Sequence, residues 1–201
     1  MFTKNAARKT CDWLVRSGGI EDSKRVVYEF GLDKLYTSLA NFAIASIIGF
    51  MFGVFLQTAL FFGVYIALRV YAGGYHAKSP TICFFVSFLI LIPFVIAIRY
   101  YHLWNTPIVF WTVLLISVVT LVLLGTVENQ NKLLDSMEKK VYRRRLLRNL
   151  TVIVAIAVTL SILSQGSYAV AVLCGVMLTA ITAGVGKMVF IKQQSVNSQE
   201  S

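Results

Sequence analysis

Long stretches without a charged residue dominate the chain, and short polar segments separate them. The uncharged runs cover residues 35–68, 81–98, 100–127 and 149–185, and a polar break, "SQGS" at 164–167, divides the last of them. A helix needs about 20 apolar residues to cross the hydrocarbon core of a bilayer. The pattern therefore predicts an all-α, polytopic integral membrane protein.

The first run is long enough for either one bent span or a tight hairpin of two. With a hairpin the chain crosses about six times, and every Lys and Arg except Arg99 falls on the side of the N-terminus. With a single span, more than half of the basic residues move to the outside, against the positive-inside bias. Charge therefore favours six spans, with the hairpin turn near residues 53–58.

The predicted organisation is a single membrane-embedded domain over 1–201. Residues 1–34 form a cytoplasmic amphipathic region, in which "NAARKTCDWLVRSGG" and "DSKRVVYEFGLDKLY" are typical of helices on the membrane surface. Residues 35–190 form the transmembrane region, and 191–201 a disordered tail. The N-terminal stretch lacks an apolar signal core, so the N-terminus is expected in the cytoplasm. With six spans, the loop around residues 69–80 and the C-terminus are expected on the same side.

Composition agrees with a membrane protein. Hydrophobic residues make up 57% of the chain and charged residues 14%, and the mean hydropathy is +0.73. The net charge of +10 comes from clusters at the edges of apolar runs, so topology accounts for it and nucleic-acid binding is not expected. Three scattered cysteines and two histidines give neither a disulfide framework nor a closed metal site, and no cofactor is expected.

The segment "RVYAGGYHAKSPTIC", residues 69–83, is the strongest candidate for chemistry. Gly73 and Gly74 permit a break after the preceding span, and Pro80 suits the first position of a new helix with Ser79 as its N-cap. Cys83 then lies in the first turn, where the helix dipole favours a thiolate.

His76 lies in the loop just before this helix and could fold back over the thiol as a general base. Spacing alone leaves open the plainer interpretation, in which His76 is an interfacial residue and Cys83 a small apolar one. No Asp or Glu occurs between Asp33 and Glu128, so a Cys-His dyad is the simplest assignment. Glu29, Asp33 or Glu128 could still approach in space as a third member.

The same segment resembles the signature of the accessory gene regulator B (AgrB) family, membrane cysteine endopeptidases of Gram-positive quorum sensing. The predicted six spans, with a basic loop before the last two, agree with that family over most of the chain. The resemblance implies that His76 and Cys83 are the catalytic dyad. It also implies that Arg69 and Gly74 support activity. Gly73 and Lys78 of the same segment are further candidates for supporting or substrate-binding roles.

The resemblance further implies the reaction and the partners. The substrate would be an AgrD-like propeptide, cut through a thioester acyl-enzyme that an internal cysteine resolves into a thiolactone, or a serine into a lactone. A homodimer in the cell membrane is implied as well. The alternatives are a small peptide transporter or exporter, with the residue 72–80 break as its substrate site, and a non-catalytic membrane scaffold.

Other candidates have plainer explanations. Arg69 ends a span and could simply anchor it at the interface. The basic segment "KKVYRRRLLR", residues 139–148, is a topology determinant that could also dock an acidic peptide tail. Cys11, Cys174 and His102 are assigned to structure.

Overall fold

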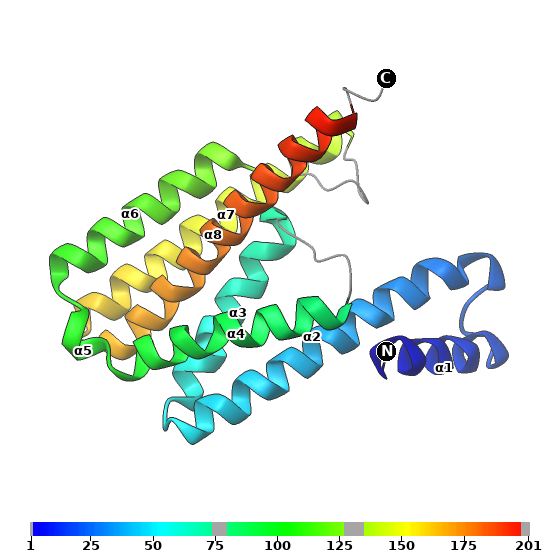
Figure 1. Cartoon of the computed structure of the whole chain (residues 1–201), viewed down its shortest axis with the longest axis horizontal. Coiled ribbons are helices and arrows are strands. Elements are labelled where there is room, and N and C mark those ends of the chain that lie inside the picture. Colours follow the sequence, from blue (N-terminus) through cyan, green and yellow to red (C-terminus); the bar gives the residue numbers. More distant parts are fainter. Residues whose placement is uncertain (1, 74–79, 127–134, 198–201) are drawn as a thin grey trace.

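A computed structural model describes residues 2–73, 80–126 and 135–197, and the regular elements among these residues are all helices (Figure 1). The helices are α1 (Phe2–Arg16), the 3-10 turn η1 (Asp22–Lys24), α2 (Arg25–Met51), α3 (Phe55–Ala72), α4 (Pro80–Arg99), α5 (Tyr101–Trp104), α6 (Pro107–Leu124), α7 (Ser136–Ile162) and α8 (Gly166–Asn197).

The first apolar run forms the hairpin that the charges favour. Helix α2 ends at Met51 and α3 begins at Phe55. Between them Gly53 adopts a φ of +67°, a conformation that glycine accepts without steric cost, and the Val54 N–H donates to the Gly49 carbonyl at 2.8 Å. The hairpin is confirmed, and its turn is at residues 52–54, at the start of the expected 53–58 window.

Five segments of the described chain are long and apolar enough to cross a membrane: Asp22–Met51, Phe55–Ala72, Pro107–Leu124, Met137–Ile162 and Gly166–Val189. Helix α4 adds a sixth apolar helix of 20 residues, which matches the length that a crossing needs. The prediction of an all-α, polytopic membrane protein is confirmed.

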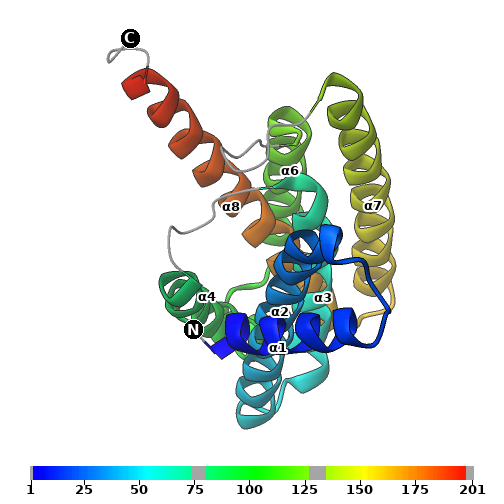
Figure 2. The ribbon, with the colours of Figure 1, turned by 90° about the vertical axis from the view of Figure 1, so that its right-hand side faces the viewer.

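Helix α8 forms the centre of the bundle. Its membrane segment is 72% buried, far more than that of any other candidate span, and α3, α6 and α7 pack around it (Figures 1 and 2). Helix α8 approaches α3 closely at Gly175, where a Cβ would lie 2.7 Å from Val64 Cγ1 and 2.9 Å from the Phe61 carbonyl oxygen. A glycine there lets the two backbones approach closely, as small residues do at membrane helix crossings.

The N-terminal region differs from its sequence prediction in one respect. Helix α1 ends before Gly18, as expected, and packs against α2 through a buried Cys11 and an Arg25–Asp12 ion pair. The second stretch is not a separate surface helix. It is the first part of α2, because no proline and only one glycine, Gly31, interrupts the helical sequence leading into the span.

Three turns lie at one end of the bundle. Gln57 lies beside the α2–α3 turn and Ser167 beside the α7–α8 turn, and Gln57 Nε2 donates to Ser167 Oγ at 3.3 Å. The Tyr101 ring of α5 packs against Gly166, also at the α7–α8 turn. At the other end, the Tyr71 ring of α3 meets the Tyr142 ring of α7 with centroids 6.0 Å apart. The chain thus alternates between two ends, as six crossings require.

Helix α8 continues beyond the bundle. It extends to Asn197, so residues 191–197 are helical in the segment for which the sequence predicts disorder, and the last four residues lie outside the described part of the chain.

Candidate active site at the α3–α4 junction

Arg69 lies in the last turn of α3 and is half-buried. Its Nη1 donates to the hydroxyl of Tyr65, one turn earlier, and its guanidinium carbon lies 5.3 Å from the centroid of the Tyr65 ring. This contact combines a hydrogen bond with a cation–π interaction. Tyr65 holds the guanidinium along α3. The four-residue spacing of Tyr65 and Arg69 is the one signal in the sequence that points to this pair.

The predicted break after α3 is confirmed at Gly73. The helix ends at Ala72, and Gly73 takes a φ of +71° while its N–H donates to the Arg69 carbonyl at 3.0 Å. A side chain would be strained in this conformation. Gly74, His76 and Lys78 lie outside the described residues.

Helix α4 begins at Pro80, as the sequence predicts. Cys83 is its fourth residue and therefore lies in the first turn, where backbone N–H groups have no partner within the helix. The described part of the chain thus fixes the backbone position of Cys83, while the approach of His76 to its thiol falls outside it.

Asp33 on α2 has one buried carboxylate oxygen. This oxygen, Oδ1, accepts no hydrogen bond from the described residues, and α2 packs against α4. Asp33 is one of the three acids that the sequence leaves open as a third catalytic residue, and Glu128 lies outside the described chain.

Helix α7 contacts the C-terminal end of α3 through two side chains. Besides the Tyr71–Tyr142 contact, Asn149 Nδ2 donates to the Ala67 carbonyl at 3.4 Å. The basic segment of α7 therefore begins beside the α3 end that carries Arg69 and Gly73.

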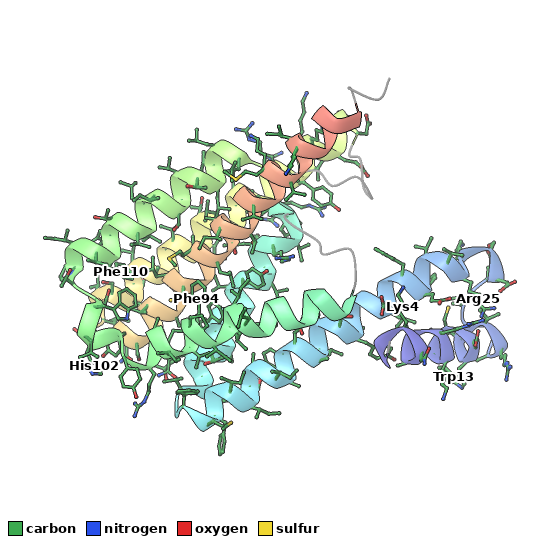
Figure 3. The ribbon with its side chains drawn as sticks, in the orientation of Figure 1. Lys4, Trp13, Arg25, Phe94, His102 and Phe110 are labelled. Carbon is green, nitrogen blue, oxygen red and sulfur yellow. The ribbon has the colours of Figure 1, made fainter. Side chains whose placement is uncertain are left out.

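The residues assigned to structure have structural surroundings. Cys11 is fully buried with its Sγ 3.5 Å from the Arg25 carbonyl oxygen, and Cys174 is 4% exposed within α8. His102 lies in α5, at the other end of α4 from Pro80, and its ring contacts Tyr101 (Figure 3). No group of three His, Cys, Asp or Glu side chains in the described segments could hold a metal ion.

The helices and this junction define a multi-pass membrane protein with a glycine break and a cysteine-bearing helix start between its second and third spans. The family model for accessory gene regulator B matches residues 7–183. The chain belongs to the accessory gene regulator B family, which takes part in processing the autoinducing peptide of agr quorum sensing. No curated protein and no solved structure matches it.

Proposed function

We propose that the chain is a membrane cysteine endopeptidase that removes the C-terminal tail from an AgrD-like propeptide. The observation that carries the proposal is the start of α4 at Pro80, which puts Cys83 in the first turn of a helix directly after the predicted loop of His76. A helix N-terminus favours the thiolate over the thiol. Membership of the family supports the peptide as substrate.

In the proposed reaction the Cys83 thiolate attacks the scissile carbonyl, and free N–H groups at the start of α4 stabilise the oxyanion. As the tetrahedral intermediate collapses, the C–N bond breaks and His76 protonates the leaving amine. The product is a thioester between Cys83 and the N-terminal portion of the peptide.

An internal thiol of the propeptide then attacks this thioester. Its proton passes to His76, the new C–S bond closes a thiolactone ring, and Cys83 leaves as the thiolate. One thioester replaces another, so the exchange costs little free energy, and ring closure competes with hydrolysis where water is excluded. A serine in place of the internal cysteine would give a lactone.

The remaining predicted residues support this site in the proposal. Arg69 is held by Tyr65 at the end of α3, and Gly73 turns the chain toward α4. Gly74 and Lys78 belong to the same segment. The site faces the cytoplasm, and the enzyme acts as a homodimer.

Substitution Cys83→Ala tests the proposal. In a purified assay with the cognate propeptide, we expect cleavage to fall below about one thousandth of wild type, because the nucleophile is removed. Wild type should form an adduct on Cys83 with the mass of the N-terminal portion of the peptide, and hydroxylamine should release it. Cys11→Ala, with its thiol buried between α1 and α2, is the matched control and should cleave normally. Normal cleavage by Cys83→Ala, as a transporter or scaffold would allow, would refute the proposal.

A further inference from the structure

The first turns of α7 carry a groove that the peptidase reaction does not use. Its volume is about 460 Å³, and it is lined by Val141, Arg144, Arg145 and Arg148; we call it the arginine groove. All four residues are exposed, and none of the three guanidinium groups pairs with a carboxylate within the described segments. A groove lined by three arginines suits an anion, and the planar fork of arginine matches phosphate oxygens in particular.

The groove lies on the outer face of α7. The face that packs inward carries Leu146, Leu150 and Ile153, which are at most 7% exposed. Tyr142 and Asn149, which contact α3, belong to that inner face. At 3.6 residues per turn the groove residues fall on another side of the helix, away from α3 and the candidate active site. Figure 2 shows α7 at the edge of the bundle, farthest from α4.

An exposed apolar stripe continues from the groove along the same side of α7. Val152 follows Arg148 by four residues and is 54% exposed, and Ile156 follows Val152 by four and is 42% exposed. Residues four apart are neighbours on a helix surface. Because Met137–Ile162 is one of the candidate spans, the arginine groove lies where the charged start of α7 passes into its membrane segment.

We propose that the arginine groove binds the headgroup of an anionic phospholipid, whose acyl chains follow the Val152–Ile156 face. Charge complementarity accounts for the phosphate and the apolar stripe accounts for the chains. An acidic peptide would match the guanidinium groups alone and would leave the stripe unexplained. The volume lies within the range of about 300–1,000 Å³ that is common for small-ligand sites. The site does not depend on the peptidase activity proposed above.

Native mass spectrometry of the purified full chain tests this inference. The protein is mixed with equal amounts of dioleoyl phosphatidylglycerol and dioleoyl phosphatidylcholine, which share acyl chains and differ in net charge. We expect wild type to retain the anionic lipid about tenfold more often, as one or two charge-assisted contacts allow. The variant Arg144→Gln, Arg145→Gln, Arg148→Gln should lose this preference.

The same helix offers a matched control. Lys139→Gln, Lys140→Gln, Arg143→Gln removes the same charge from α7 outside the groove and should keep the preference. Arg144→Lys, Arg145→Lys, Arg148→Lys keeps the charge for insertion and folding while removing the planar fork, and should reduce the preference in part.

Several results would overturn the inference. The first is that wild type shows no preference for the anionic lipid. The second is that both glutamine variants lose this preference equally, which would indicate unspecific charge attraction. Displacement of the lipid by equimolar glycerol 3-phosphate would indicate a free phosphate site. Displacement by an equimolar acidic peptide would assign the groove to the propeptide tail.

Discussion

At the scale of single residues, the three cysteines occupy three different environments. Cys11 is enclosed between α1 and α2, Cys174 is enclosed within the central helix α8, and Cys83 lies at a helix start. A thiol must be both accessible and ionised to act as a nucleophile. Burial removes accessibility from Cys11 and Cys174, and the helix start at Cys83 favours the thiolate.

Alkylation by iodoacetamide at neutral pH should therefore modify Cys83 first. We expect its rate to exceed that of Cys11 and Cys174 by about tenfold or more, because a thiolate reacts and a buried thiol does not. Peptide mapping by mass spectrometry over a time course measures each rate separately. Faster labelling of Cys11 or Cys174 would contradict the assignment of the nucleophile.

The role of His76 is tested by the same reaction. His76→Ala should slow alkylation of Cys83, because the imidazole no longer stabilises the thiolate. The chain contains two histidines, and His102→Ala is the matched control, since α5 lies at the opposite end of α4 from Pro80 (Figure 3). A similar slowing in both variants would point to a global effect on folding.

At the scale of elements, close backbone contact between α3 and α8 positions the end of α3. Gly175→Ala would place a methyl group against Val64 and the Phe61 carbonyl and force the helices apart. We expect a loss of stability of about 1–3 kcal/mol, as overpacking typically costs. Thermal unfolding in detergent measures it. Gly184→Ala on the same helix is the control, because its nearest neighbour is Leu124 Cδ1 at 3.9 Å; it should be neutral or slightly stabilising.

Local signals in the sequence predicted some of these elements well. Charge distribution resolved the α2–α3 hairpin, and Gly73 and Pro80 marked the end of α3 and the start of α4, because glycine and proline constrain the backbone wherever they occur. For the same reason the position of Cys83 at a helix start was predictable, and the position of His76 over it stays a prediction.

Features that depend on tertiary contact could not be read in the same way. The packing of α1 on α2 rests on a Thr10–Tyr36 hydrogen bond of 2.9 Å and an Arg25–Asp12 ion pair, between residues distant in sequence. The arginine groove depends on which face of α7 is left uncovered by α3 and α8. Periodicity shows that a face is basic, and packing decides whether that face is free.

At the scale of the whole molecule, the basic residues gather at one end of the bundle. The other end is formed by the α2–α3 turn, α5 and the α7–α8 turn, and Arg99 is the Lys or Arg that the described residues place there. The opposite end holds Arg69, the basic start of α7 and Lys187 and Lys192 of α8. The positive-inside bias predicts that this second end, with Cys83, faces the cytoplasm.

Labelling of intact cells tests this orientation. A membrane-impermeant maleimide should react with Leu103→Cys, beside Asn105 in a region where the native side chain is 76% exposed, because that turn is expected outside. It should not react with Lys78→Cys or Lys140→Cys until the cells are opened. Labelling of Lys78→Cys and Lys140→Cys after the cells are opened is the control, because it shows that both thiols can react with the maleimide. External labelling at Lys140, in the charged first turns of α7, would mean that the bundle has the opposite orientation. A cytoplasmic propeptide could then no longer reach Cys83, and the proposed reaction would fail at its first step.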